Sequence, residues 1–172
     1  MTAGAWARDL LPGVALPTLT TTEEQVFYFR PRPGAPAALP SFIHWDAVTH
    51  YGLPGPGGLV KVGEHHTGVV TTGDDRAGRI DAARRRRAVS YTERWLPGLA
   101  GWVVDEGTCL YTSTPSLDFV IDRVGPLVVG CGFSGLGFKY VPEVGRRLAS
   151  LARGDGGAEP PFSLASHHSR DK

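Results

Sequence analysis

Sulfur is scarce in this chain of 172 residues. Cysteine occurs only at positions 109 and 131, and methionine only at position 1. Two thiols cannot build the disulfide framework of a small secreted domain, so we expect reduced thiols in a cytoplasm. Cys109 and Cys131 are also too far apart, and lack accompanying histidines, for a zinc motif. The presence of Cys109 in "GTCLYTSTPSLDFVID" therefore needs another explanation.

Long apolar runs and an excess of one charge sign are absent as well. No stretch is long and apolar enough to span a membrane, and the start lacks the apolar core of a signal peptide. The 18 basic and 17 acidic residues leave a net charge of +1, which gives no reason to expect a nucleic acid or an anionic membrane as partner. We therefore expect one globular, cytoplasmic domain with a real core.

Lysine occurs only at positions 61, 139 and 172, and the other basic residues are arginines. Codon bias explains the scarcity but not the placement. Lys61 and Lys139 both lie beside glycines and apolar residues, in "GGLVKVGEHH" and "GFSGLGFKY". Because an ammonium is a compact charge whose pKa responds to burial, both lysines are candidates for a functional role.

The local patterns predict an α+β fold with a mostly antiparallel sheet. Aromatic and β-branched residues or alternating patterns predict strands in five segments: 23–31, 41–55 with a hairpin, 57–68 broken by Gly63, 102–115 and 118–125. A turn at 2–5 leads into a short helix. The best helical stretch lies within 74–101, capped by Asp74 or Asp75 and ended by Pro97-Gly98.

The last ordered part is expected to be a strand at 127–129, a glycine loop and a helix containing Val144, Leu148 and Leu151. This arrangement directs backbone N–H groups and a helix dipole at an anion or an electron-rich ring, although a plain glycine-rich turn explains the glycines equally well. The polar tail from Gly154 is expected to be mobile.

Some candidate groups have simpler interpretations. Cys109 is either a small buried apolar side chain or a nucleophile or attachment point. His65 and His66 would point to opposite faces of a strand, so we expect no metal site. The Arg84–Arg87 run covers all sides of a helix, which favours a solvated helix over a nucleic-acid patch. Ser134 lacks the glycine spacing of a nucleophile elbow.

Three segments together resemble a known family: "GLVKVGEHH", "TCLYTSTPSLDFVIDR" and "VGCGFSGLGFKYVPEVG". They are similar, in the same order, to the carboxyl half of monomeric sarcosine oxidase and its N-methyl amino acid oxidase relatives, FAD-dependent amine oxidases of the D-amino-acid-oxidase superfamily. The resemblance covers roughly residues 2–152. It implies oxidation of the CH–NH bond of sarcosine or another N-methyl amino acid by FAD and oxygen, giving an imine, then an aldehyde, and hydrogen peroxide.

The resemblance also implies roles for single residues. Cys109 matches the residue that links its sulfur to the 8α carbon of the flavin. Lys61 matches the lysine that promotes oxygen reduction, His65 an active-site histidine and Tyr51 a tyrosine of the substrate pocket. Tyr111 would line the same cavity.

In the glycine loop, Lys139 matches the lysine that pairs with the substrate carboxylate. The residues whose backbone would lie against the flavin are Gly135, Leu136, Gly137 and Phe138. The family usually has histidine at the position of Leu136.

No G-x-G-x-x-G fingerprint lies near the amino terminus, although the resemblance implies a dinucleotide-binding unit for the ADP part of FAD. We therefore expect the carboxyl-terminal part of an oxidase, inactive alone, whose partner is the missing amino-terminal half. The expected domains are 1–12, the end of the FAD-binding domain; 13–124, the substrate domain; 125–153, a strand–loop–helix returning to the FAD-binding domain; and 154–172, a flexible tail.

Other functions stay open at this point. The chain could be a non-catalytic remnant of the family, or part of an oxidase for a different amine or amino acid. A basic binding module acting through Arg84–Arg87 is a third possibility.

Overall fold

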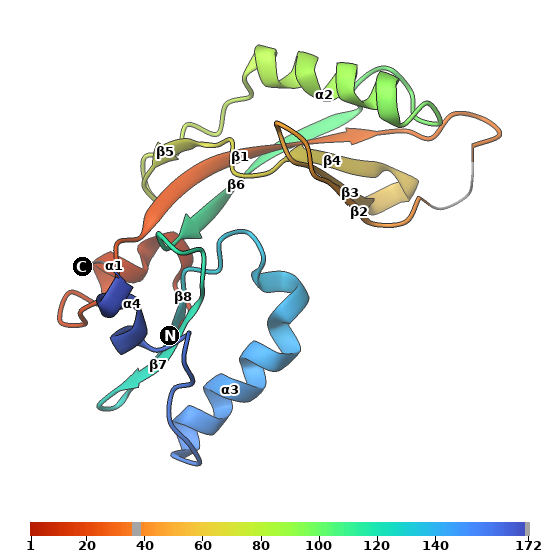
Figure 1. Ribbon diagram of the computed structural model, residues 1–172. Helices are drawn as coiled ribbons and strands as arrows, with labels where there is room; N and C mark the ends of the chain where they lie inside the picture. The colour runs from red at the N-terminus through yellow and green to blue at the C-terminus, as the bar shows by residue number, and fades with distance from the viewer. Residues whose placement is uncertain (36–38, 171–172) are drawn as a thin grey trace. The chain divides into compact units, whose positions relative to one another are not determined.

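The computed structural model describes residues 1–35 and 39–170 (Figure 1). The chain forms two compact units. The central unit consists of Glu23–Val69 and Arg76–Cys109, and the terminal unit consists of Met1–Thr22, Val70–Asp75 and the chain from Leu110 onward. Among the described residues, no helix has the length and apolar character needed to cross a membrane.

The central unit contains most of a six-stranded sheet. Its strands follow the order β2 (Phe42–His44), β3 (His50–Pro54), β4 (Val60–Glu64), β1 (Thr20–Phe29) and β5 (Val69–Thr71), and β6 (Asp105–Ser113) also pairs with β1. The pairs β2–β3, β3–β4 and β1–β4 are antiparallel. The unit boundary falls within β1, β5 and β6. This sheet confirms the expected α+β class with antiparallel strands.

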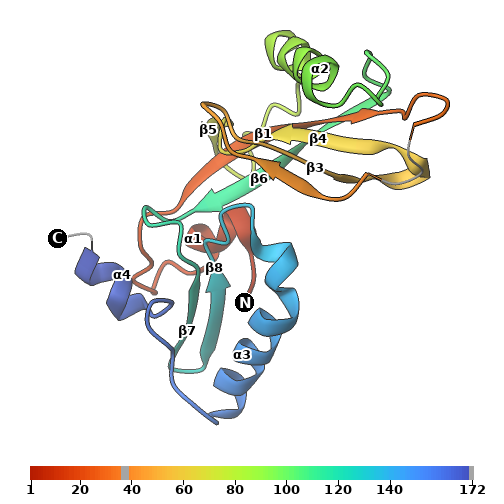
Figure 2. The same cartoon turned by 45° about the vertical axis from the view of Figure 1, so that its right-hand side comes forward.

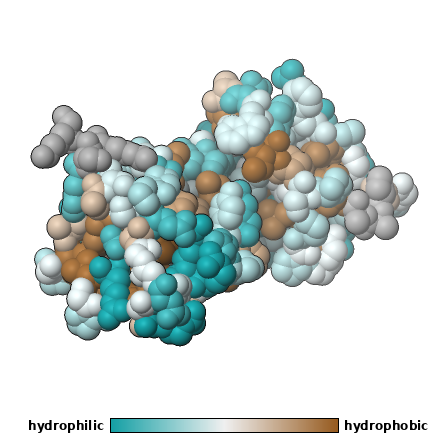
Figure 3. All heavy atoms as spheres, turned by 60° about the horizontal axis from the view of Figure 1, so that its bottom comes forward, coloured by the Kyte–Doolittle hydropathy of each residue, from teal (hydrophilic) through white to brown (hydrophobic). Residues whose placement is uncertain are grey.

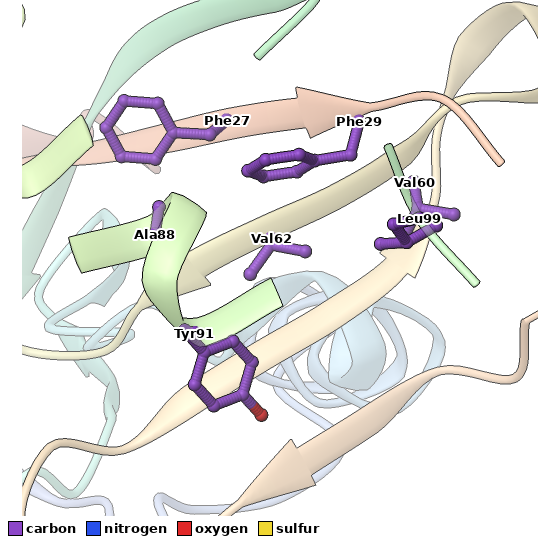
Figure 4. Packing of buried hydrophobic residues seen from close by; sticks show 7 residues of the cluster. All are labelled: Phe27, Phe29, Val60, Val62, Ala88, Tyr91 and Leu99. Carbon is purple, nitrogen blue, oxygen red and sulfur yellow. The ribbon is translucent and has the colours of Figure 1, made fainter. Parts of the chain in front are cut away.

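Helix α2 (Ala82–Trp95) covers one face of the sheet, and the core of the central unit lies between them. Phe27 and Phe29 of β1 pair with Val62 and Val60 of β4, so these four side chains share a face. Figure 4 shows them gathered with Leu99 and the α2 side chains Ala88 and Tyr91. We call this side of the sheet the helix face, and the other side the second face.

The terminal unit is built around a hairpin of β7 (Val120–Val124) and β8 (Leu127–Cys131) (Figure 2). Ile121 packs with Leu148 and Leu151 of α3 (Val141–Arg153). Val120 and Val129 pack instead with side chains of α1 (Ala7–Leu10) and α4 (Leu164–Arg170). The hairpin is therefore the middle of three layers. The short helices η1 (Gly4–Trp6) and η3 (Gly137–Tyr140) precede α1 and α3, and η2 (Pro56–Gly58) precedes β4.

The structure differs from some of the local expectations. Helix α2 is capped by Asp81, which accepts a hydrogen bond from Ala83 N at 2.7 Å. Asp74 instead accepts from the Trp6 indole at 2.8 Å, and Asp75 from the Thr72 hydroxyl. The loop before the helix is held against β1, because Glu23 accepts from the backbone N–H groups of residues 77 and 78. The cap therefore lies after this loop.

A second difference concerns Gly63, which does not break its strand. It lies inside β4, where it pairs with Val26 of β1 and Tyr51 of β3. The polar tail, which was expected to be mobile, contains α4. Leu164 and His167 of this helix are buried, and the His167 ring lies 3.1 Å from Phe119 O. The strands predicted at 102–115 and 118–125 correspond to β6 and β7. They lie in separate sheets, since β6 pairs with β1 and β7 pairs with β8.

The Arg84–Arg87 run is not simply a solvated helix face. Arg84 is buried and donates to Thr67 O, while Arg85 binds Glu106. Arg87 donates to both carboxylate oxygens of Glu64, at 2.7 and 2.8 Å. Three of the four arginines thus connect α2 to the strands and loops beside it, which leaves little charge for a nucleic-acid patch.

The surface carries several exposed apolar side chains. On the face shown in Figure 3, hydrophobic residues lie exposed among hydrophilic ones. The most exposed large apolar residues of the described chain are Val70, Trp45, Trp102 and Phe138, the last at 93%. Single exposed apolar residues are ordinary in globular proteins, but a Phe at this exposure in a glycine loop marks a segment without its own packing partner.

Candidate functional site

The second face of the central sheet brings together the residues predicted for that unit. Lys61 pairs with Tyr28, and Gly63 pairs with Val26, one step along the same face. Tyr51 pairs with Gly63 from the other side. Since side chains alternate along a strand, Lys61 and Tyr51 lie on the face opposite α2. Lys61 Nζ lies 5.9 Å from the centre of the Tyr51 ring.

Gly63 makes room for the Tyr51 ring. A Cβ at this position would lie 2.9 Å from the ring atoms of Tyr51, closer than van der Waals contact allows. The ring of His65 meets Tyr51 edge-on, with centroids 6.2 Å apart. Tyr51 therefore contacts both Lys61 and His65, and Gly63 leaves the room that the Tyr51 ring needs.

Cys109 of β6 belongs to the same unit and is a half-buried free thiol. Burial raises the pKa of this thiol, the Lys61 ammonium lowers it, and the Glu24 carboxylate raises it. Cys109 is thus close enough to Lys61 to be influenced by its charge. Because burial has the largest effect, the pKa of the Cys109 thiol lies above its ordinary 9.0.

The two adjacent histidines do not diverge as expected. Strand β4 ends at Glu64, and His66 adopts a left-handed backbone with φ of 57°. Their rings consequently meet at a centroid distance of 4.1 Å. Within residues 1–35 and 39–170, no three His, Cys, Asp or Glu side chains are grouped so that they could hold a metal ion.

The terminal unit positions the glycine loop against Tyr111. The loop is tied to β6 by Ser134 N, which donates to Thr112 O at 3.0 Å. Gly135 has φ of 75°, and a Cβ there would lie 2.3 Å from the Tyr111 ring. Only glycine satisfies both the backbone conformation and the close approach of the ring. Ser134 is itself buried, with its hydroxyl on Gly132 O, so it is not presented as a nucleophile.

The remaining loop residues differ in exposure. Leu136 is partly buried against the cluster that contains Phe119. It also lines a cavity of about 400 Å³ in the terminal unit, together with Tyr140 and Phe162. Lys139 is exposed, and its Nζ lies 5.6 Å from the centre of the Tyr140 ring.

The predicted residues thus fall into two groups, one in each unit. The group in the central unit consists of Tyr51, Lys61, His65 and Cys109, and the group in the terminal unit consists of Tyr111, Gly135, Leu136, Gly137, Phe138 and Lys139. In the first group, Tyr51 contacts Lys61 and His65, and in the second, Tyr111 contacts Gly135. Their roles stay predictions.

Sequence reasoning missed Glu24. This residue lies in β1 and is 1% exposed, and its carboxylate accepts a hydrogen bond from Thr67 N at 3.2 Å. The sequence did contain a signal, because Glu23, Glu24 and Gln25 follow one another in a predicted strand. Successive side chains point to opposite faces of a sheet, so at least one of these polar groups faces the packed side, which is unusual.

Comparison with known proteins tests the resemblance. The family described as FAD dependent oxidoreductase matches residues 1–151. The chain belongs to this family. Monomeric sarcosine oxidase of Streptomyces avermitilis is 38% identical over 163 residues, which cover 87% of this chain and 42% of that protein. Human peroxisomal sarcosine oxidase is 34% identical, over 88% of this chain and 43% of that protein.

Solved structures of the family share the fold. Iminodiacetate oxidase from Chelativorans sp. BNC1 matches with a TM-score of 0.72 and 21% identity, over 92% of this chain and 43% of that one. A mutant of Amadoriase I from Aspergillus fumigatus matches with a TM-score of 0.75 and 17% identity, over 99% and 43%. The chain therefore spans less than half the length of these relatives.

Proposed function

We propose that this chain is part of an FAD-dependent oxidase that acts on the CH–NH bond of sarcosine or another N-methyl amino acid. The products would be an imine, which water hydrolyses to an aldehyde, and hydrogen peroxide. The observation that carries the proposal is that Cys109 shares the second face of the central sheet with Lys61, because Gly107, two residues before Cys109, faces Val26 on that side. The sarcosine oxidases among the relatives support the substrate class.

When bound, FAD would accept a hydride equivalent from the carbon beside the amine and pass two electrons to oxygen. The protein's task is to hold and orient the reactants and to supply charge. Cys109 would attach the cofactor through its sulfur. Lys61, packed on Tyr51, would stabilise negative charge that develops on oxygen as it is reduced.

Lys139 would pair with the substrate carboxylate and so align the amine, and its exposed position leaves the ammonium available for such a contact. In the central unit, Tyr51 and His65 would line the substrate cavity. Leu136 replaces the histidine usual in the family, so we propose a substrate that need not interact with an imidazole there, which keeps other N-methyl amino acids and other amines in consideration.

The chain would act together with an amino-terminal, FAD-binding half, because it spans only 42% of the Streptomyces avermitilis relative. Its exposed apolar side chains, including Phe138, are consistent with further polypeptide against this surface. We propose that the isolated chain is inactive and that its activity depends on this partner.

The test is to produce the chain together with the amino-terminal part of the Streptomyces avermitilis enzyme and to assay flavin and hydrogen peroxide. We expect yellow protein whose flavin stays attached after acid precipitation, and peroxide formation from sarcosine or N-methyl amino acids. The variant Cys109→Ser should release its flavin on precipitation, whereas Cys131→Ala should not, because Cys131 is buried in the terminal unit.

Two results would contradict the proposal. Flavin that remains covalently bound in Cys109→Ser would exclude Cys109 as the attachment point. Protein that is colourless and forms no peroxide from any amine, although it folds and binds the supplied half, would favour the non-catalytic remnant instead.

A further inference from the structure

Strand β1 places a buried carboxylate beside the proposed flavin attachment point. Two contacts fix the register between β1 and β6. A Cβ on Gly107 would lie 3.9 Å from Val26 Cγ2, and the Thr21 and Thr112 hydroxyls lie 3.5 Å apart. The two positions lie five residues apart on each strand and in opposite order, so the strands run antiparallel and no bulge lies between the two contacts.

This register puts Glu24 directly across from Cys109. Glu24 lies two residues before Val26, and Cys109 lies two residues after Gly107, so each shares the second face with its neighbour. Directly opposed residues of antiparallel strands have Cβ atoms about 5 Å apart. The charge of Glu24 acts on the Cys109 thiol, in agreement with this placement.

Glu24 is held in this position. It is 1% exposed and accepts a hydrogen bond from Thr67 N. Gly68 allows the approach, because a Cβ there would lie 2.5 Å from Glu24 Oε1. The neighbouring Glu23 is equally buried, but it points to the other side of β1 and binds the backbone at residues 77 and 78. The two carboxylates are therefore a natural matched pair.

The charged groups that influence Cys109 come from two strands of the same sheet, β1, which pairs with β6, and β4, which pairs with β1. Glu24 approaches from β1, and Lys61 from β4. The other titratable side chains on this face include Tyr28, which pairs with Lys61, Tyr51, which pairs with Gly63, and His65, which follows β4. A thiol near both a carboxylate and an ammonium experiences opposite effects, since the anion disfavours the thiolate and the cation favours it.

We propose that Glu24 is a positioning residue of the attachment site, whose carboxylate favours the protonated form of Cys109 and opposes the Lys61 ammonium. The inference rests on the proposed role of Cys109 in binding the flavin. Because the thiolate is the reactive form in alkylation and oxidation, the balance of these two charges sets how readily Cys109 reacts.

The experiment measures alkylation of Cys109 by iodoacetamide in the full chain without flavin, from pH 6.5 to 9.5, with peptide mass spectrometry to separate it from Cys131. At pH 8 we expect Glu24→Gln to react roughly threefold to fivefold faster than the unchanged chain, with its rate profile moved to lower pH. Glu24→Asp should restore the slow rate. Lys61→Met should react more slowly than the unchanged chain.

Glu23→Gln is the control, since it removes the same charge from the other side of the strand. An unchanged rate in Glu24→Gln, or equal acceleration in Glu23→Gln, would overturn the proposal. If Glu24→Gln does not fold, Glu24→Met removes the same charge with a side chain of similar length, and the same outcomes apply. The assay needs no flavin, so its failure would not bear on the attachment test with Cys109→Ser.

Discussion

Arg87 of α2 and Glu64 of β4 form a bidentate ion pair that connects the helix to the sheet, with N–O distances of 2.7 and 2.8 Å. Glu64 is 6% exposed, while the Arg87 side chain is 49% exposed. Thr67 adds a third hydrogen bond to the carboxylate at 3.0 Å. The pair therefore satisfies a carboxylate that lies almost entirely out of water.

Arg87→Met should destabilise the chain by about 1–3 kcal/mol, because it leaves the Glu64 carboxylate buried with fewer partners. The loss is not larger, because the Arg87 side chain is half exposed and water screens its charge. Urea unfolding checks this. Arg86→Met is the matched control, since Arg86 is exposed and should change stability by less than about 0.5 kcal/mol. Equal effects of the two variants would contradict the role of the ion pair.

The same pair predicts a pH dependence. Burial alone would raise the pKa of Glu64, but hydrogen bonds from Arg87 and Thr67 hold it below its ordinary 4.5. A carboxyl with a lowered pKa in the folded state contributes stability that is present above pH 4.5 and is lost as the pH falls through the folded value. Unfolding measured from pH 7 to pH 3 should show this loss, and Glu64→Gln should reduce it.

His50 should contribute a second pH effect at higher pH. Its ring stacks on Tyr91 with centroids 3.8 Å apart, and burial lowers its pKa from 6.5. Since the folded state prefers the neutral ring, the contribution is present above pH 6.5 and declines as the pH falls through the folded value. Thermal unfolding between pH 7.5 and pH 5 should be less pH-dependent in His50→Phe. His66→Asn, at an exposed histidine, should retain the dependence of the unchanged chain.

Gly63→Ala should disturb the Tyr51–Lys61 contact, because the added Cβ would collide with the Tyr51 ring. We expect a loss of about 1–3 kcal/mol of folding stability from overpacking. Gly107→Ala tests the same change on the same face, where the nearest side-chain atom would lie at an ordinary 3.9 Å. A smaller loss in Gly63→Ala than in Gly107→Ala would show that Tyr51 does not need this glycine.

Gly135→Ala should destabilise the glycine loop by about 1–3 kcal/mol, through its positive φ and the contact with Tyr111. Gly145→Ala makes the same change inside α3, where no atom lies within 4 Å of the new Cβ. There we expect a gain of about 0.5–1 kcal/mol from helix propensity. Urea unfolding of both variants distinguishes strain in the loop from a general effect of alanine.

In the complete oxidase, Lys139→Met should raise KM for an N-methyl amino acid by at least about tenfold, with a smaller change in kcat. The reason is the loss of a charge partner for the substrate carboxylate. Lys139→Arg should recover part of the affinity. An unchanged KM for N-methyl amino acids would contradict the assignment. An equal rise in KM for amines without a carboxylate would contradict it as well.

The sequence predicted much of the fold because its patterns are local. The strand at Thr20–Phe29 and the helix at Ala82–Trp95 follow from residue types within each segment. The helix cap was misplaced because Asp74 and Asp75 are consumed by contacts with Trp6 and Thr72, which no local pattern reveals. The tail helix was missed because its stability comes from burying Leu164 against β7 and β8, not from propensity.

By itself, the sequence determined the family, because the motifs that identify it are short contiguous stretches that need no coordinates. It also singled out Cys109, Lys61 and Lys139, since rare residue types in unusual settings can be read without coordinates. Only the tertiary structure decided which charges surround the thiol. Glu24 and Cys109 are 85 positions apart, and strand register alone makes them neighbours, because pairing across a sheet depends on contacts between distant segments.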